Sequence, residues 1–352
     1  MKNHLCLLIL LLGSTVPGLS QANPAYLSEG HTDLGIFYSP AGTNRLSMKA
    51  EDDDHGVSYA PSQVVLVASQ DARFDLPPGT PFGNEGDPLW ILPQSQYPGW
   101  LYLGLSTETI SPGTFNGPLT YTLKSLDLPG RMSTNVTERF YVWQAGQFGD
   151  FNVFMNSADG LTAADAIALP AGAHAHYNWG FSTSGLWHVT FQVSGRVAGE
   201  TTNTASTNIT FAFHVLPLRP FEQWQATNWL PATPRSIIGP TADPDGDGTP
   251  NLVEYALGMN PTNASAAGLP TVSIVATNGQ RYGALTYTHV KSATDVTCEV
   301  VAASSLTAPN WQPLTTVHSV EDLGDRERIT VRDNLPLNAA SQRFYQLRVR
   351  LP

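Results

Sequence analysis

The densest group of potential metal ligands in the chain lies in residues 243–254, DPDGDGTPNLVE. Oxygen donors recur along it at Asp243, Asp245, Asp247, Thr249 (through its carbonyl group), Asn251 and Glu254. This is the spacing of an EF-hand-type calcium loop, in which Gly248 allows the sharp bend and the final glutamate closes the shell with both oxygens. Three carboxylates within five residues repel one another unless a cation lies among them. We therefore expect calcium here, and the alternative is a solvated acidic turn before a helix over residues 251–257 that ends at Gly258.

Two histidines, His174 and His176, are separated by a single alanine. Side chains at i and i+2 of a strand lie on one face, about 7 Å apart at Cα, which is close enough to share one ion. His31 and Asp33 form a second pair of this kind near the start of the chain. Together the pairs offer three nitrogens and one carboxylate, a donor set that suits zinc or another transition metal. Nothing in the spacing shows that the pairs meet, so ordinary polar strand faces remain the alternative.

The segment that contains the histidine pair is interpreted as a hairpin with its turn at Ser184. The cross-strand pairs in this register are Phe181 with Trp187, Trp179 with Val189 and Tyr177 with Phe191. These apolar side chains share one face, so both histidines of the pair point away from the core. His188 then lies too far along the strand to join them, and we expect it to be an ordinary surface histidine. His55, in the acidic run EDDDHG, is interpreted as part of a solvated loop.

Residues 30–216 alternate short apolar or β-branched runs with turn signals. The runs that predict strands are LGIFY (34–38), SQVVLVAS (62–69), PLWILP (88–93), WLYLGLST (100–107), RFYVWQAG (139–146), FNVFMNS (151–157), HVTFQVSG (188–195) and NITFAFHVLPL (208–218). Many short strands without a long helical pattern are typical of an antiparallel β-sandwich. We expect an all-β, immunoglobulin-like fold for this part of the chain.

The character of the chain changes at about residue 218. Phe221 and Trp224 stand at helical spacing, and a proline-rich stretch leads from there into the acidic segment. Beyond Gly268 a second set of β-rich runs begins, among them TVSIVAT and RFYQLRVRL. The predicted parts are a signal peptide (1–22), a β-sandwich domain (23–218), a helical linker with the calcium loop (219–267) and a C-terminal β-domain (268–352).

The first 22 residues carry the pattern of a secretory signal peptide. Lys2 precedes the apolar run Leu5–Leu12, and Ser20-Gln21-Ala22 offers small residues at a cleavage position. We therefore expect export to the extracellular space, the cell surface or the periplasm. Cys298 is then the only cysteine of the mature chain, so no internal disulfide can form.

The composition narrows the possible partners. Only 13% of the residues are charged and the net charge is −11, which makes nucleic acid and anionic membranes poor partners and cations better ones. No apolar stretch after the leader approaches the roughly 20 residues of a transmembrane helix, so we expect no transmembrane segment in the mature chain.

No nucleophile or metalloprotease motif such as GxSxG or HExxH is visible in the sequence. A shell of three histidines and one aspartate leaves no open position for water, which catalysis at zinc needs, so we expect a binding protein and not an enzyme. Two alternatives remain, a metal-dependent hydrolase with an open coordination position and an adhesion or carbohydrate-binding module. The latter would use the aromatic residues Trp90, Tyr97, Trp100 and Tyr102 to stack on sugars, although alternation along a strand favours core packing.

Three motifs of the first domain resemble the bacterial surface domain family called choice-of-anchor M, which is related to the actinobacterial surface-anchored protein domain. They are GHTDLGIFY (30–38), LWILPQSQYPGWLYLGLSTE (89–108) and LPAGAHAHYNWGFSTSGLWHVTFQVSG (169–195). The resemblance implies a secreted protein with a metal-related role, and His31, Asp33, His174 and His176 fall within its motifs. The insertion EDDDHG at 51–56 and the lack of a C-terminal anchoring helix depart from the family pattern.

The second half of the chain carries two further resemblances. The acidic loop is similar to dockerin and thrombospondin type 3 calcium loops, which implies a structural role at the junction of two domains. About 130 residues at the C-terminus resemble a module of exported proteins of verrucomicrobial type. We thus predict a secreted, non-catalytic surface or periplasmic protein that binds or handles a transition metal and carries a structural calcium site, with a metal-uptake system or a surface glycan as its partner.

Overall fold

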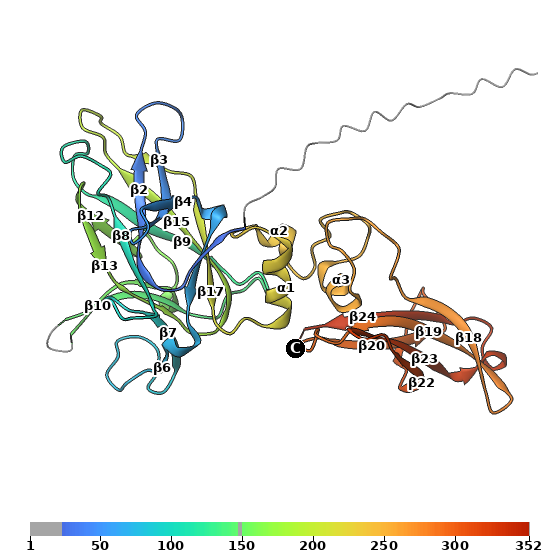
Figure 1. Cartoon of the computed structure of the whole chain (residues 1–352). Coiled ribbons are helices and arrows are strands. Elements are labelled where there is room, and N and C mark those ends of the chain that lie inside the picture. Colours follow the sequence, from blue (N-terminus) through green and yellow to red (C-terminus); the bar gives the residue numbers. More distant parts are fainter. Residues whose placement is uncertain (1–22, 147–149, 352) are drawn as a thin grey trace, which may run out of the picture.

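The structure is a computed structural model that describes residues 23–146 and 150–351, so the predicted signal peptide lies outside the described residues. The described chain is 45% strand and 10% helix, which confirms the all-β prediction. Two β bodies are joined by three short helices, α1 to α3 (Figure 1). None of the helices in the described part of the chain is long and apolar enough to cross a membrane.

The largest sheet of the first body has the order β1-β5-β17-β15-β9-β12, with β16 paired to β15. Its strands are β1 (Ala25–Leu27), β5 (Val64–Ala68), β9 (Leu119–Asp127), β12 (Ala166–Leu169), β15 (Gly185–Gly195), β16 (Thr204–Ala205) and β17 (Ile209–Val215). Most pairings in this body are antiparallel, as predicted. The pairs β1–β5, β5–β17 and β2–β8 are parallel, so the sheets are mixed.

The second sheet has the order β13-β8-β2-β3-β4. Its strands are β2 (Gly30–Tyr38), β3 (Leu46–Asp52), β4 (Val57–Tyr59), β8 (Leu101–Ser106) and β13 (His174–His176). Alternate residues such as Leu34, Ile36 and Leu103 are buried in the main apolar core. Because successive side chains of a strand point to opposite faces, the residues between them lie on the other face of the sheet.

The third sheet has the order β11-β10-β14-β7-β6. Its strands are β6 (Arg73–Asp75), β7 (Pro88–Leu92), β10 (Phe140–Ala145), β11 (Phe151–Asn156) and β14 (Asn178–Phe181). Short 3-10 helices η1 (Pro61–Gln63), η2 (Gln70–Ala72) and η3 (Ser157–Asp159) connect strands of the first body.

The hairpin predicted over residues 177–191 is wrong. Strand β14 pairs with β10 and β7 in the third sheet, whereas β15 lies between β9 and β17 in the largest sheet. The apolar residues alternate in both strands because each strand turns its apolar face to the same core, and not because the two strands pair with each other. There the rings of Phe181 and Trp187 meet edge to face with their centroids 5.4 Å apart. Tyr177, Trp179 and Phe181 are buried, as expected.

Tyr121 ties the largest sheet to the second one. This residue of β9 is fully buried, and its hydroxyl lies within hydrogen-bonding distance of two carbonyl oxygens, that of Leu34 at 3.1 Å and that of Ser106 at 2.5 Å. Leu34 belongs to β2 and Ser106 to β8. A buried polar group without a partner costs about 1–3 kcal/mol, so this contact favours one placement of the two strands.

Three helices, α1 (Pro220–Asn228), α2 (Arg235–Ile238) and α3 (Asn251–Leu257), lie between the two bodies (Figure 1). On the first body, the Arg235 guanidinium donates to a carboxylate oxygen of Asp127 in β9 at 2.8 Å. On the second body, Phe221 and Tyr255 pack in an apolar cluster with Val296. Helix α3 has the predicted bounds, because Gly258 follows it with a left-handed φ of 73° that favours glycine at a helix end.

The second body consists of two facing sheets with orders β18-β19-β23-β22 and β21-β20-β24. Its strands are β18 (Thr271–Thr277), β19 (Gln280–Val290), β20 (Thr297–Ala303), β21 (Gln312–Pro313), β22 (Thr316–Asp322), β23 (Arg326–Pro336) and β24 (Phe344–Arg350), with the 3-10 helix η4 (Leu337–Ala339). Cys298 packs at the edge of its core, where burial raises the pKa of the thiol to about 11.

Candidate metal centre

The second sheet brings His31, Asp33, His174 and His176 together on the face that turns away from the core; we call these four residues the histidine site. His31 and Asp33 lie on β2, the other two histidines lie on β13, and β8 runs between these strands. Asp33 and His176 are both directly opposite Gly104 of β8. Residues about 140 positions apart in the sequence therefore become neighbours across a single strand.

Gly104 is what allows the side chains of Asp33 and His176 to converge. A Cβ atom at this position would collide with Oδ1 of Asp33 and would lie 2.8 Å from Cε1 of His176. The space above this strand is thus occupied by functional groups from its two neighbours. Glycine inside a strand often marks such a close approach.

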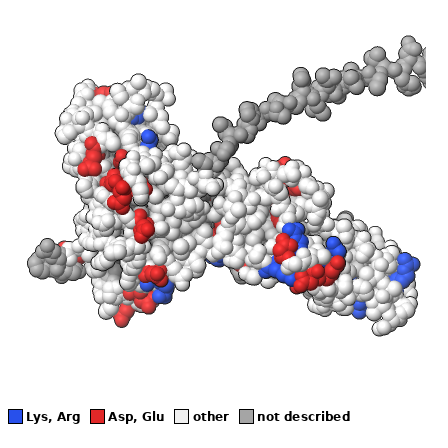
Figure 2. Space-filling model, viewed as in Figure 1, with Lys and Arg blue, Asp and Glu red and all other residues white. Residues whose placement is uncertain are grey.

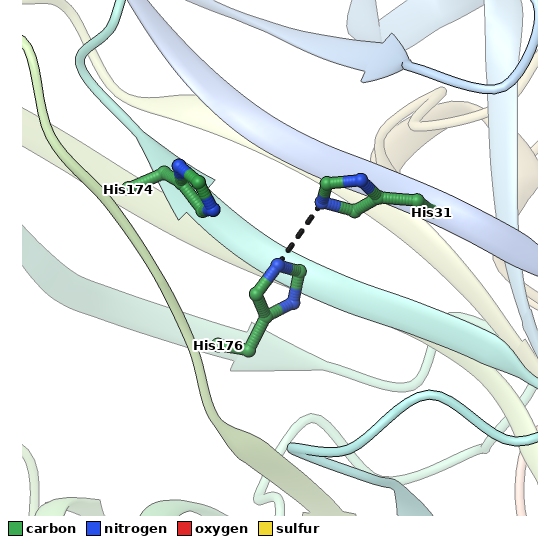
Figure 3. A group of neighbouring side chains, drawn as sticks. All are labelled: His31, His174 and His176. Atoms are coloured by element: carbon green, nitrogen blue, oxygen red, sulfur yellow. Dashed lines mark hydrogen bonds between the residues drawn. The ribbon is translucent and has the colours of Figure 1, made fainter.

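The nitrogen and oxygen atoms of the histidine site point at one another. The Nε2 atoms of His31 and His176 are 3.0 Å apart (Figure 3). Oδ1 of Asp33 lies 3.6 Å from the former nitrogen and 3.8 Å from the latter. The three histidines each offer a ring nitrogen within 4.8 Å of the other two. Three potential ligand atoms, from His31, His176 and Asp33, therefore lie within 3.8 Å of one another, and His174 has a ring nitrogen within 4.8 Å of the other two histidines. A single ion with ligand bonds of about 2 Å can bridge these atoms after small shifts of the side chains.

Carboxylates hold two of the imidazoles from outside. Nδ1 of His31 lies 3.4 Å from a carboxylate oxygen of Asp53, and Nδ1 of His174 lies 3.0 Å from one of Glu108. Metal-ligating histidines usually have such a partner on their second nitrogen, because it fixes the tautomer and the direction of the ring. The sequence reasoning missed Asp53 and Glu108, since charged residues of this kind are common on exposed loops.

Tyr102 supports His176. The two rings are stacked with centroids 3.5 Å apart and an angle of 7° between their planes. The His176 side chain is only 8% exposed, whereas that of His174 is 42% exposed. The histidine site therefore has a closed side formed by Tyr102 and His176 and an open side at His174, through which an ion can enter from solvent.

Burial changes the protonation of two residues in the histidine site. It raises the pKa of Asp33 to about 6, and it lowers the pKa of His176 to about 4 together with the neighbouring His31 and His174. Oδ1 of Asp33 has no hydrogen-bond partner among the described residues, although Asp33 is only 2% exposed. A neutral imidazole and an unsatisfied carboxylate oxygen are the forms that bind a metal ion.

Two other histidines stand apart from this arrangement. His55 is exposed and bonds to Asp52 at 3.0 Å, and it belongs to none of the groups of potential ligands among the described residues. His188 is only 5% exposed, so the expectation of a surface histidine is wrong. It lies on β15 in the middle of the largest sheet, where Trp229 and Ile238 of the linker line the same small cavity. Burial lowers the pKa of His188 to about 4.

The aromatic run of residues 89–102 does not form one continuous platform. Trp90 is 9% exposed and belongs to the main core, and Tyr102 stacks on His176. Tyr97 and Trp100 contact each other with ring centroids 5.8 Å apart, and Phe74 lies 5.7 Å from Trp100. Core packing therefore accounts for part of the run and leaves a smaller aromatic group near the surface.

The acidic loop, residues 243–254, forms a second cluster of oxygen atoms. Asp243, Asp245 and Asp247 each offer a carboxylate oxygen within 4.8 Å of the other two. Glu254 is completely buried, and neither of its carboxylate oxygens has a hydrogen-bond partner among the described residues. Burial, together with the three aspartates, raises the pKa of Glu254 to about 7. A cation among these oxygens would satisfy the buried carboxylate.

The loop is held in shape by its own backbone and by the linker. Gly246 and Gly248 have left-handed φ values of 74° and 90°, which other residues rarely adopt. The Asn251 amide donates to the carbonyl oxygens of Ile237 at 2.8 Å and Gly239 at 2.9 Å, while its own oxygen is buried without a partner. The backbone N–H of Thr249 donates to Asp247 at 2.8 Å. This side of the loop is thus tied to the segment that follows α2.

No protein-family model matches the chain, and no curated protein matches it either. The resemblance to the choice-of-anchor M family therefore stays a prediction, and the geometry of the two clusters is what bears on function.

Proposed function

We propose that the protein is a secreted, non-catalytic metal-binding protein that takes a transition-metal ion at His31, Asp33, His174 and His176. The observation that carries this proposal is the buried Oδ1 atom of Asp33, which lacks a hydrogen-bond partner and faces the Nε2 atoms of His31 and His176. An unpaired buried carboxylate costs several kcal/mol, and a cation offsets that cost.

The donor set indicates which class of ion is bound. Three imidazoles and one carboxylate suit Zn²⁺ or another first-row transition metal, whereas Ca²⁺ and Mg²⁺ prefer shells made of oxygen. A shell filled by four protein ligands leaves no position for a reacting water, which favours binding or handling of the metal over hydrolysis. The side chain of His174 is exposed to solvent, which supports a site whose metal ion can exchange with solvent.

Calcium is proposed for the acidic loop. Its ligands would be Asp243, Asp245, Asp247, Asn251 and Glu254, with the carbonyl group of Thr249. The fully buried and unpaired carboxylate of Glu254 is the main support, because hard oxygen donors with this charge match Ca²⁺. Since α3 begins inside the loop and packs on the second body, the role we propose for the ion is to stiffen the junction.

Export and a surface or periplasmic location belong to the same proposal. They are supported by the leader-like sequence of residues 1–22 and by the resemblance of residues 30–216 to bacterial surface domains. The partner proposed on this basis is a metal-uptake system, which would receive the ion from the histidine site.

The test is a metal analysis of the full chain after loading with zinc or copper in the presence of saturating calcium. We expect one tightly bound transition-metal ion per chain and its loss in the double variant His174→Ala, His176→Ala. His55→Ala is the matched control, because His55 is an exposed histidine outside the histidine site and its loss should leave metal content unchanged. Absence of any bound transition metal after loading would refute the proposal.

A second candidate function is glycan binding. The supporting observation is the group of Phe74, Tyr97 and Trp100, of which the first is 44% and the second 53% exposed. Exposed aromatic rings of this kind stack on sugar rings. A glycan array probed in calcium-containing buffer, with Trp100→Ala for comparison, tests this candidate, and an array without signal would count against it.

A further inference from the structure

A group of acidic side chains lies beside the histidine site on the same face of the sheet. Beneath it are Gly35 of β2 and Ser106 of β8, which are directly opposite each other, and Ser106 is also opposite His174 of β13. The Glu51 carboxylate lies above Gly35, where a Cβ atom would collide with it and would come within 3.3 Å of the Glu51 Cγ. Gly35 therefore leaves room for the Glu51 carboxylate from the neighbouring strand, as Gly104 leaves room for Asp33 and His176.

Asp33 lies between the histidine site and this acidic group. One of its carboxylate oxygens lies within 4.8 Å of a carboxylate oxygen of Glu108 and a ring nitrogen of His174, in addition to the contacts with His31 and His176. Asp33 is 2% exposed, and its Oδ1 has no hydrogen-bond partner among the described residues. A carboxylate with an unpartnered oxygen, close to potential ligands on either side, is suited to bridge two ions.

The charge on this face exceeds what one divalent ion would neutralise. Carboxylates of Asp33, Glu51, Asp53 and Glu108 meet here, and no lysine or arginine of the described residues forms a salt bridge with any of them. The ammonium group of Lys49 partly offsets the charge of Glu51 without forming a salt bridge with it, and its Nζ atom lies over the ring of Phe37 at 4.7 Å from the centroid. Like charges this close destabilise one another unless cations lie between them. Figure 2 shows acidic side chains on the first body with few basic ones near them, whereas the second body carries both kinds side by side.

We propose that this face binds two divalent ions, with the carboxylate of Asp33 as the bridge. The first ion is held by His31, His174, His176 and Asp33, so its shell stays filled by protein ligands. The second is held by Asp33 and Glu108, which belong to one group of potential ligands, and by Glu51, whose carboxylate lies above the neighbouring Gly35. Ions that share a carboxylate are typically about 3.5–4 Å apart. The second position is richer in oxygen, so it favours Mn²⁺ or Zn²⁺ over softer ions such as Cu⁺.

This inference rests on the proposed function, and counting ions distinguishes the two. The full chain, saturated with calcium, is titrated with Zn²⁺ by calorimetry and, separately, with Mn²⁺ while electron paramagnetic resonance spectra are recorded. We expect two Zn²⁺ ions per chain and a spin-coupled pair of Mn²⁺ ions. Glu51→Gln should leave one ion with its affinity changed less than threefold, whereas Glu108→Gln should leave one ion bound about tenfold more weakly, because Glu108 also holds the ring of His174. Both variants should remove the coupling.

Glu85→Gln is the control, because Glu85 is an exposed acid in the loop before β7 and should leave two ions. Thermal unfolding of the metal-free variants checks that each variant folds. Correct folding is expected, because glutamine and glutamate have nearly the same shape. A single ion in the wild type, or two ions that persist in both variants, would overturn the second site and leave the proposed function standing. A chain that binds no transition metal would overturn both.

Discussion

The histidine site and the acidic loop share one feature and differ in another. Each has a buried carboxylate with an unpartnered oxygen, Asp33 in one and Glu254 in the other. The ligands of the loop, however, are contiguous in the sequence and continue into a helix, whereas those of the histidine site come from two strands separated by β8. The loop must fold around its ion, while the histidine site lies on a sheet that the core already holds in place.

This difference separates the expected roles of the two ions. The strands of the histidine site are fixed from below by the main core and by the hydroxyl of Tyr121. The acidic loop joins α2 to α3, and hydrogen bonds such as those of Asn251 hold it there, while Asp243, Asp245 and Asp247 lie on the chain that turns between the two helices. Calcium should therefore stabilise the fold, and the transition metal should be cargo whose removal leaves the fold intact.

The largest expected effect is that of calcium removal on stability. An ion that binds only the folded state adds about 2.7–4.1 kcal/mol at a 100- to 1,000-fold excess over its Kd, so chelation should lower the melting temperature by several degrees. Asp245→Ala should abolish that sensitivity. Differential scanning calorimetry with and without chelator measures both effects. Removing the transition metal under constant calcium is the comparison, and an equal loss of stability there would break the distinction between the two sites.

The next largest effect is expected for Gly104→Ala. The added Cβ would collide with Asp33 and crowd His176, so the two ligands must move apart. We expect transition-metal affinity to fall by about a hundredfold, which corresponds to roughly 2.7 kcal/mol. Zinc titration calorimetry measures the affinity. The calcium-dependent rise in melting temperature should be unchanged in this variant, and unchanged zinc affinity would show that the strand spacing does not set the geometry of the site.

The two regions also differ in how far the sequence predicts them. The grouping of Asp243, Asp245 and Asp247 could be predicted directly, because these residues lie close together in the sequence at the spacing of a calcium loop, and calcium there stays a prediction. Helix α3 followed with its correct bounds, since Gly258 ends it. The sequence predicts the histidine site only as two separate pairs of residues. The parallel pairing of β2 with β8 brings the two pairs together, and no local pattern in the sequence encodes that pairing.

Other errors have the same origin. The alternation of aromatic residues on either side of Ser184 predicts that those side chains are buried, but it does not say whether they pair within a sheet or meet across a core. The structure has the second arrangement, which also buries His188 beneath the linker. Gly104, inside the strand run WLYLGLST, is a sequence signal for the histidine site, because a glycine inside a strand often marks a close approach of other groups. The prediction from the sequence did not use it.

A smaller effect is expected for Asp53→Asn. Asp53 contacts Nδ1 of His31 at 3.4 Å and orients the ring without reaching the centre of the site. Loss of a partner of this kind typically weakens metal binding 10- to 100-fold, and because Asp53 is partly exposed we expect the lower end of that range. Zinc competition with a chromogenic chelator measures the change, with Asp71→Asn, an exposed acid of η2 outside the histidine site, as the control. Unchanged affinity in Asp53→Asn would mean that His31 is oriented by packing alone.

The smallest effect is a dependence of metal-free stability on pH. In the folded chain without metal, burial raises the pKa of Glu254 from its usual 4.5 to about 7, so the folded state holds this proton more tightly than the unfolded state does. The contribution of Glu254 to stability is therefore greatest below about pH 4.5 and is lost as the pH rises to about 7. Asp33 and Glu51 act in the same direction, since burial raises the pKa of the former to about 6 and of the latter to about 7.

Urea unfolding of the metal-free wild type and of Glu254→Gln at pH 5 and pH 8 isolates this contribution, because the other titrating groups are common to both proteins. We expect the wild type to lose more stability than the variant on going from pH 5 to pH 8, and calcium to remove the difference in the wild type by taking the place of the proton. The same comparison with Asp33→Asn should be insensitive to calcium and sensitive to zinc. If both carboxylates respond to the same ion, the assignment of separate ions to the two regions is wrong.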